Sequence, residues 1–268
     1  MKELRELTEK IRTGNVILFV GAGVSATLNL PTWSQMLRKV AIDLEYDPDI
    51  FSMYGDPLVL AEYYKIQKGN LKGLANWMRE KWKVEDERIR NSFVYQKIVE
   101  LDFPVIYTTN FDTCLEQAYR IFKKPYTKIA RVQDICKCQK GITQIVKLHG
   151  DVGNYHNMVL TESSYFDRMD LESPLDIKLR SDILGKSILF IGYSLSDINI
   201  RFLLYKLNKM WGFGNKKSQP RSYIFMANPN RIQEEVMRNR NITPIIGENT
   251  DQTESLEGFL GKLKQVKL

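Results

Sequence analysis

Cysteine and histidine, the side chains that most often bind metal ions, are scarce in this sequence. Its 268 residues contain three cysteines (Cys114, Cys136 and Cys138) and two histidines. An odd number of cysteines in a chain of this length does not indicate a disulfide framework. Cys136 and Cys138 could supply half of a zinc site, but there is no second cysteine pair, and the histidines are not spaced as partners. We therefore expect no bound metal.

Long hydrophobic runs are also missing. No apolar run approaches the roughly 18 residues that a membrane-spanning helix needs. Residues 1–10 are charged and helical in pattern, which is not typical of a signal peptide. The hydrophobic fraction of 43% and the charged fraction of 26% are ordinary for a globular protein. These features predict a cytoplasmic protein that folds as one domain over residues 1–268.

The net charge of +7 raises the question of nucleic-acid binding. Basic residues are spread along the whole chain, with one local cluster at Lys216, Lys217 and Arg221 in and after a predicted exposed loop, 211–218. The sequence shows no zinc finger, RNA-recognition motif or long basic helix. We expect no direct binding to nucleic acid, because an acidic ligand or an acidic partner explains the charge equally well.

Short apolar runs rich in valine and isoleucine recur along the chain and end in small or polar residues. Near-continuous hydrophobicity over about five residues is what a strand buried on both faces needs. Amphipathic stretches, such as 196–211 and 231–240, fall between most of these runs. This alternation predicts an α/β fold with a Rossmann-like, doubly wound parallel sheet. The predicted strands are 16–20, 104–107, 144–148, 187–191 and 222–226.

The segment 32–101 interrupts this alternation, because it contains no convincing strand. We interpret it as a helical insertion in a core formed by 1–31 and 102–268. Ligands of open parallel sheets bind beyond the carboxyl ends of the strands, so the insertion is predicted to form a wall or lid over a site there. Its predicted helices are 33–45, 57–68, 71–82 and 87–101.

A glycine-containing turn, Gly21-Ala22-Gly23-Val24-Ser25, follows the first predicted strand. Glycines let the backbone approach a pyrophosphate, whose oxygens accept bonds from amide groups, although many strand–helix turns use glycine for geometry alone. The full G-x-G-x-x-G pattern is absent because residue 26 is alanine. The acidic residues about 20 positions further on, Asp43 and Glu45, fall in a predicted helix. These features argue against an ordinary dehydrogenase.

Polar residues also follow the second predicted strand, in Thr108-Thr109-Asn110-Phe111-Asp112. Asn110 offers a donor and an acceptor, and Asp112 is an acceptor when ionised. Capping of a helix over 112–122 explains one such residue well, but it explains four of five less well. Capping and ligand binding both stay open for this segment.

His149 follows the predicted strand 144–148 and precedes a glycine. A histidine can act as a base at neutral pH, and this one lies at the edge of the sheet where a ligand is expected. A bond to a neighbouring loop would also explain its position. His156 has the setting of an ordinary turn residue.

Two further strand ends carry candidate contacts. Gly192-Tyr193-Ser194 follows the strand 187–191, and the Ser194 hydroxyl is placed to reach a phosphate or a ribose. Ser196 or Asp197 is predicted to cap the next helix. Asn228 follows the strand 222–226 and precedes Pro229, so helix capping and contact with a ribose or adenine are both open for it.

Taken in order, these five segments resemble the sirtuin family, and more closely the sirtuin-like domains of bacterial anti-phage defence proteins. The resemblance covers residues 15–230. It implies binding of NAD and cleavage of the bond between nicotinamide and ribose. It also implies a base role for His149 and a place for Asn110 beside the nicotinamide ribose, with Asp112 orienting them. The NAD contacts implied by the motifs are Gly21, Ala22, Gly23 and Ser25 at the phosphates, Thr109 and Gly192 nearby, and Ser194 and Asn228 on the adenosine side.

The sequence departs from the protein deacylases of this family in two ways. They carry four zinc-binding cysteines, which this chain cannot supply, and a Pro-Asp-Phe-Arg stretch where this sequence reads Leu30-Pro31-Thr32-Trp33. Defence-type relatives share these departures. The resemblance therefore implies an NAD hydrolase that depletes NAD on infection, acting as a homo-oligomer or with a HerA-type ATPase or an Argonaute system. A protein deacylase and a non-catalytic module that senses NAD or ADP-ribose are the alternatives.

Overall fold

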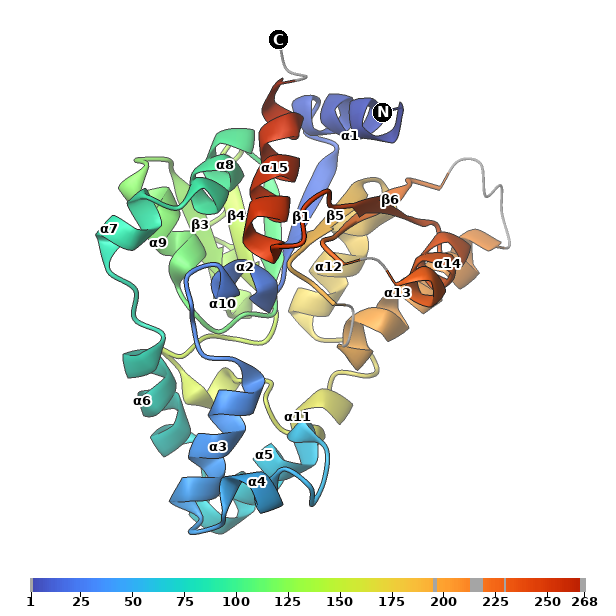
Figure 1. Ribbon diagram of the computed structural model, residues 1–268. Helices are drawn as coiled ribbons and strands as arrows, with labels where there is room; N and C mark the ends of the chain where they lie inside the picture. Colours follow the sequence, from blue (N-terminus) through green and yellow to red (C-terminus); the bar gives the residue numbers. More distant parts are fainter. Residues whose placement is uncertain (1, 195–196, 213–218, 229, 266–268) are drawn as a thin grey trace.

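A single parallel sheet of seven strands, in the order β3-β4-β2-β1-β5-β6-β7, forms the centre of the protein. The structure is a computed structural model that describes residues 2–194, 197–228 without 213–218, and 230–265 (Figure 1). The predicted Rossmann-like sheet is confirmed. Its strands are β1 (Val16–Val20), β2 (Val105–Thr108), β3 (Tyr126–Ile129), β4 (Thr143–Lys147), β5 (Ser187–Ile191), β6 (Ser222–Met226) and β7 (Ile242–Ile246).

Hydrophobic clusters on both faces of the sheet show why these sequences form strands. Side chains alternate along β1: Leu18 packs with helices on one face, and Phe19 packs with helices on the other. The first face is covered by α1 (Lys2–Arg12), α8 (Phe93–Leu101), α9 (Cys114–Ile121) and α15 (Gln252–Gln265). The second is covered by α12 (Pro174–Leu184), α13 (Ile198–Gly212) and α14 (Arg231–Asn239).

The two edge strands were not predicted from the sequence. β3 has only four residues, and its side chains are mostly half-buried or exposed. β7 contains Pro244, which lacks a backbone N–H, so a proline fits only at an edge or an interruption of a sheet. Both strands therefore lack the continuous apolar pattern of the central strands.

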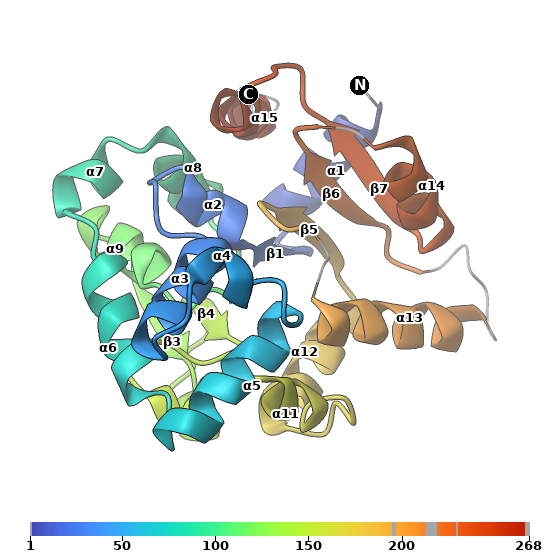
Figure 2. The same cartoon turned by 60° about the horizontal axis from the view of Figure 1, so that its bottom comes forward.

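A helical module lies at the end of the molecule opposite the two chain termini (Figure 1). It comprises α3 (Trp33–Asp43), α4 (Pro48–Phe51), α5 (Pro57–Lys68) and α6 (Lys72–Lys81), which share a hydrophobic cluster of their own. Phe111 and Leu160 join this cluster, so the module packs on loops that follow β2 and β4. Figure 2 shows α5 beside α11 (Glu162–Phe166).

The sequence stretch 87–101 forms two helices where one was predicted. α7 (Asp86–Arg90) ends before Ser92, whose side chain accepts a bond from the Tyr95 amide and starts α8. α8 then packs against α9 and α15. The remaining short helices are α2 (Ala22–Ala26), α10 (Val132–Ile135) and the 3-10 helix η1 (Tyr155–Asn157).

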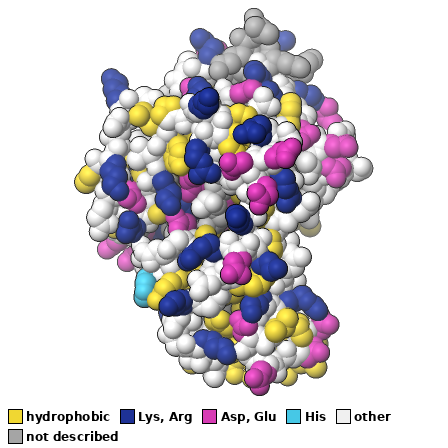
Figure 3. Space-filling model, turned by 90° about the vertical axis from the view of Figure 1, so that its left-hand side faces the viewer, with side chains coloured by type: hydrophobic (Ala, Val, Ile, Leu, Met, Phe, Trp, Pro, Cys, Tyr) yellow, Lys and Arg dark blue, Asp and Glu magenta, His cyan; other side chains and the backbone are white. Residues whose placement is uncertain are grey.

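Lysine and arginine side chains are dispersed over the face drawn in Figure 3 and alternate there with acidic side chains. Among the helices of the described residues, none combines the length and the apolar character needed to cross a bilayer. The predicted loop at 211–218 lies mostly outside the described residues, and its first two residues end α13.

Candidate active site

The turns that follow β1 and β5 pack directly against each other. β1 pairs with β2 on one side and with β5 on the other. The strands before β5 are added on one side of β1 and the later strands on the other, so the strand order reverses at this point. The Gly21 amide donates to the Ile191 carbonyl (3.0 Å) and the Gly23 amide to the Gly192 carbonyl (2.8 Å). A Cβ atom on Gly21 would lie 2.3 Å from the Gly192 oxygen. Gly192 itself has φ +58°, which favours glycine.

A buried polar network joins the turn after β1 to the turn after β2. The Asn110 side-chain amide donates to the Gly21 carbonyl and to Ser25 Oγ, both at 3.0 Å. Ser25 Oγ donates to Asp112 Oδ2 at 2.7 Å, and Asp112 Oδ1 accepts from the Cys114 amide at 3.0 Å. Asp112 thus satisfies an amide at the start of α9. Asn110 instead holds the two turns together.

His149 is almost completely buried, with 2% of its surface exposed. Its Nε2 lies 3.2 Å from Asp197 Oδ2, and its Nδ1 lies 3.5 Å from the Tyr165 hydroxyl. The Tyr165 ring meets the imidazole edge-on, with 5.1 Å between centroids. His149 is therefore enclosed by a carboxyl group and a phenol.

Asp197 has two roles, and the sequence suggested only one. Its Oδ1 accepts bonds from the Asn199 and Ile200 amides (2.9 and 3.1 Å), which confirms the predicted helix cap. Its Oδ2 faces His149. Ser196, the alternative cap, lies outside the described residues.

Burial sets the protonation of this pair. Desolvation and then the nearby Arg168 guanidinium lower the pKa of His149 well below its usual range, whereas burial raises the pKa of Asp197. Arg168 is fixed by Asp176 and by the carbonyl of Leu148. The imidazole is therefore neutral near neutral pH, and it lies next to a carboxyl group with which it can exchange a proton during a reaction.

Lowering the pH below 6.5 is expected to destabilise the protein through His149. The folded state keeps a lowered pKa, whereas an unfolded histidine titrates near its ordinary value of 6.5. Below 6.5 the unfolded state therefore binds the extra proton, and the stability that this group contributes above that pH is lost as the pH falls. The slope from one such group is up to about 1.4 kcal/mol per pH unit.

Urea unfolding at a series of pH values measures this effect. Replacing His149 by glutamine should flatten the slope below pH 6.5, while replacing the exposed His156 should leave it unchanged. The raised pKa of Asp197 makes the folded state more stable as the pH falls, which is opposite to the effect of His149. This contribution is confined to pH values above the ordinary pKa of 3.8, and Asp197 is present in all three proteins. Equal slopes in the wild type and the His149 variant would contradict the lowered pKa.

A cavity of about 1110 Å³ opens beside these turns, between the sheet and the helical module. Six of the predicted ligand contacts line it: Ala22, Gly23, Thr109, Gly192, Ser194 and Asn228. The other five predicted residues, Gly21, Ser25, Asn110, Asp112 and His149, lie outside the set of described lining residues. Asp197 and Tyr165 both line the cavity and both contact His149, so they stand between it and the imidazole.

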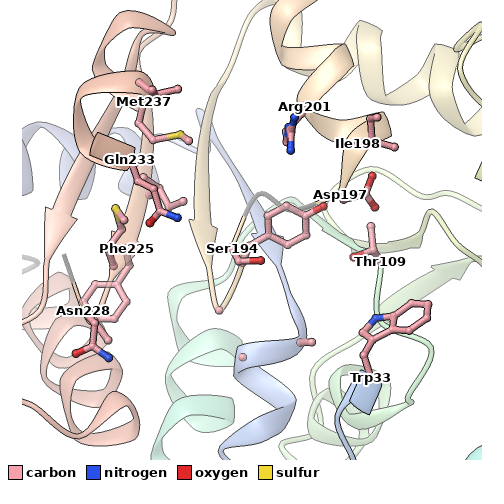
Figure 4. Close-up of a pocket in the computed structure, with 18 of the residues that line it drawn as sticks. Trp33, Thr109, Ser194, Asp197, Ile198, Arg201, Phe225, Asn228, Gln233 and Met237 are labelled. Carbon is pink, nitrogen blue, oxygen red and sulfur yellow. The ribbon is translucent and has the colours of Figure 1, made fainter. Parts of the chain in front are cut away.

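The cavity has two facing walls (Figure 4). Thr109, Asp197 and Trp33 lie on one side, and Phe225, Gln233 and Asn228 on the other. Asn230 caps α14 by accepting from the Ile232 and Gln233 amides (3.0 and 3.3 Å). Because Asn230 serves as the cap, Asn228 is available to a ligand, and Pro229 lies outside the described residues.

Several lining residues were not predicted as contacts, and three of them have large or charged side chains that could hold a ligand. Trp33 comes from the first helix of the module, Tyr165 from α11, and Arg201 from the first turn of α13. Only Arg201 had a usable signal, because it lies one helical turn after Asp197. Trp33 and Tyr165 reach the site through the packing of the module and of α11, which no local pattern reveals.

The three cysteines differ in exposure: Cys114 is buried, Cys136 is exposed and Cys138 is half-buried. In the part of the chain that the structure describes, no three histidine, cysteine, aspartate or glutamate side chains are grouped to hold a metal ion.

The parallel sheet, its reversal point at β1 and β5, and the cavity beside that point define a Rossmann-like α/β protein with a ligand cleft. A sequence model of the SIR2-like domain matches residues 104–245. These residues are more than half of the chain, so the chain belongs to the SIR2-like domain family.

The chain is similar to bacterial proteins named NAD(+) hydrolase and to one named as a defence-associated sirtuin. The chain is 28% identical over 204 residues to NAD(+) hydrolase ThsA of Enterococcus faecium, covering 75% of this chain and 41% of that protein. It is 25% identical over 231 residues to NAD(+) hydrolase ThsA of Cytobacillus dafuensis, covering 86% and 44%. It is 27% identical over 243 residues to Defense-associated sirtuin 2 of Bacillus subtilis, covering 87% and 23%. The chain thus spans less than half of the length of each of these relatives.

Proposed function

We propose that this protein hydrolyses the bond between nicotinamide and ribose in NAD, releasing nicotinamide and ADP-ribose. The observation that carries the proposal is the buried His149–Asp197 pair, whose Asp197 lies at one wall of a large cleft. Pockets for small ligands and cofactors commonly measure about 300–1,000 Å³, so a cavity of about 1110 Å³ has room for a dinucleotide. The similarity to proteins named NAD(+) hydrolase supports the choice of ligand.

In the proposed reaction the glycosidic bond breaks as nicotinamide leaves with the bonding electrons. The ribose carbon then carries positive charge, which the Asp197 carboxylate at the cavity wall would stabilise. Water attacks that carbon, forms the new C–O bond and releases one proton. The coupled pair of Asp197 and His149 would receive this proton. The products are nicotinamide, ADP-ribose and a proton, so atoms and charge balance.

We assign the remaining predicted residues by where they lie. Asn110 would orient the nicotinamide ribose and the attacking water, held in place by Ser25 and Asp112. The turn residues Gly21, Ala22 and Gly23, with Thr109, Gly192 and Ser194, would shape the part of the cleft that holds the phosphates and riboses. Asn228 would contact the adenosine.

Replacing Asn110 by alanine tests this assignment. Release of fluorescence from etheno-NAD should be lost in the variant, because its amide connects Gly21 and Ser25 beside the cleft. The assay is run on the purified protein alone, in its separate oligomeric states, and with co-expressed partners. If the folded wild type were as inactive as the variant in every state, hydrolysis would not be the function.

The wider role that we propose is depletion of NAD in the cytoplasm during phage infection. The name of one relative, Defense-associated sirtuin 2, supports a defence role. A homo-oligomer, a HerA-type ATPase or an Argonaute system would then supply the activating signal. Cellular NAD should fall after infection in cells that express the wild type and stay constant in cells that express the Asn110→Ala variant.

The enclosure of His149 favours one second candidate, a module that senses NAD or ADP-ribose without turning it over. With 2% of its surface exposed, the imidazole does not reach the cavity directly in this conformation. Tight binding of NAD with no release of nicotinamide, in any oligomeric or partner state, would establish this second function instead.

A further inference from the structure

We propose that Arg201 is the residue that recognises the phosphates of the bound dinucleotide, an inference that rests on the proposed function. The glycine turn is a poor phosphate site by itself. The amides of Gly21, Gly23 and Val24 already donate to carbonyl oxygens of Ile191, Gly192 and Gly21. The negative charge of a pyrophosphate therefore needs another source of donors, and cationic side chains are the obvious one.

Two arginines line the cavity, Arg201 on α13 and Arg240 at the end of α14. Among the described lining residues, these two arginines are the ones with a cationic side chain. Within the described part of the chain, neither guanidinium has a hydrogen bond or an ion pair with a protein group. Both are therefore available to an anionic ligand.

Position separates the two arginines. Figure 4 shows Arg201 pointing into the space between the wall that carries Asp197 and the wall that carries Gln233. Arg240 belongs to the second wall, on the same helical segment as Gln233. The cleft thus presents the Asp197 carboxyl group at one end, a cation in the middle, and apolar and amide side chains at the other end.

This order matches the order of chemical groups in NAD. The reacting ribose would lie at Asp197, the pyrophosphate at Arg201, and the adenosine against Phe225 and Asn228. A guanidinium can bond two phosphate oxygens at once through its planar fork. Arg201 would fix the dinucleotide by its centre and so place the glycosidic bond at Asp197.

Binding measured by calorimetry tests the proposal without requiring turnover. The ligands are ADP-ribose, which has the pyrophosphate, and adenosine, which lacks it. Arg201→Ala is expected to weaken binding of ADP-ribose by about tenfold or more, as for loss of a charge-assisted bond, and to leave adenosine binding unchanged. Arg201→Lys should restore part of the loss, since a lysine keeps the charge but not the fork.

Two charge-matched variants complete the design. Lys209→Ala removes one positive charge from an exposed position of α13 away from the cavity, and Arg240→Ala removes the other lining cation. Lys209→Ala should change binding of ADP-ribose by less than about threefold, which is the scale of a distant screened charge. Arg240→Ala should weaken it less than Arg201→Ala does, because Arg240 belongs to the wall away from Asp197.

The proposal would be overturned by no binding of ADP-ribose to the wild type, by a loss in Arg201→Ala no larger than in Lys209→Ala, or by the large loss in Arg240→Ala instead. An equal loss of adenosine binding in Arg201→Ala would also overturn it, because the damage would then be general. If Arg201 governs binding of ADP-ribose but NAD is not hydrolysed, the proposed function fails while this inference stands.

Discussion

Replacing His149 by alanine is expected to lower the rate of NAD hydrolysis by about 10²- to 10⁴-fold, the usual contribution of a general acid–base group. The reason is the geometry around its Nε2, which lies 3.2 Å from Asp197 Oδ2. Without the imidazole, Asp197 loses the partner with which it would share the proton released by the attacking water. Binding should suffer much less, because Asp197 and Tyr165 separate His149 from the cavity.

The matched control is the other histidine. His156 is exposed and lies in the short helix η1, so His156→Ala should hydrolyse NAD at the wild-type rate. Initial rates at saturating NAD, with binding of ADP-ribose measured in parallel, separate chemistry from binding. A His149→Ala protein that keeps the wild-type rate would remove His149 from the mechanism.

Replacing Gly21 by alanine is expected to lower the free energy of unfolding by about 2–3 kcal/mol or more, the range for overpacking in a tight interior. The new Cβ would lie 2.3 Å from the Gly192 oxygen and 2.7 Å from the Tyr193 Cα. Both are backbone atoms of the facing turn, so neither can rotate away. The turns after β1 and β5 would have to separate, and the cavity that they line would change shape.

Gly185→Ala is the control for this substitution. Gly185 ends α12 with φ −112°, and an added Cβ there meets no atom within 4 Å. The midpoint of thermal unfolding should be lower by roughly 5–10 °C in the Gly21 variant, given about 2–4 °C per kcal/mol for a chain of this size. The midpoint of the Gly185 variant should stay near that of the wild type. Equal midpoints for the two variants would show that the turns are not closely packed.

The central strands could be predicted because burial on both faces leaves a direct mark on the sequence. β1 is a five-residue apolar run, β5 has four apolar residues after Ser187, and all residues of both strands are buried. β3 and β7 lie at the edges, where one side faces solvent and a lysine or a proline is tolerated, so this mark is weak. The break between α7 and α8 depended on one capping serine inside a continuous helical pattern.

For the candidate site, the positions of strand ends in the sequence predicted several residues that line the cavity. The side-chain pairs within the site could not be predicted in this way. Thr109, Ser194 and Asn228 line the cavity because parallel strands end at one edge of the sheet. The pairing of His149 with Asp197 depends on how α13 packs against the sheet, which no local spacing specifies. The sequence also gave no means to choose between capping and ligand binding for Asp112, whereas the structure shows its carboxylate bonded to Ser25 and the Cys114 amide.

The measurement that tests the central proposal most directly is product analysis by chromatography. The purified wild type, alone and in its oligomeric or partner-bound states, is incubated with NAD, and nicotinamide and ADP-ribose are quantified with and without an acyl-lysine peptide. The proposed function predicts nicotinamide and ADP-ribose in equal amounts, independent of the peptide, and release of both from His149→Ala slowed by about 10²-fold or more. Release of nicotinamide only when the peptide is present, or no product in any state, would contradict it.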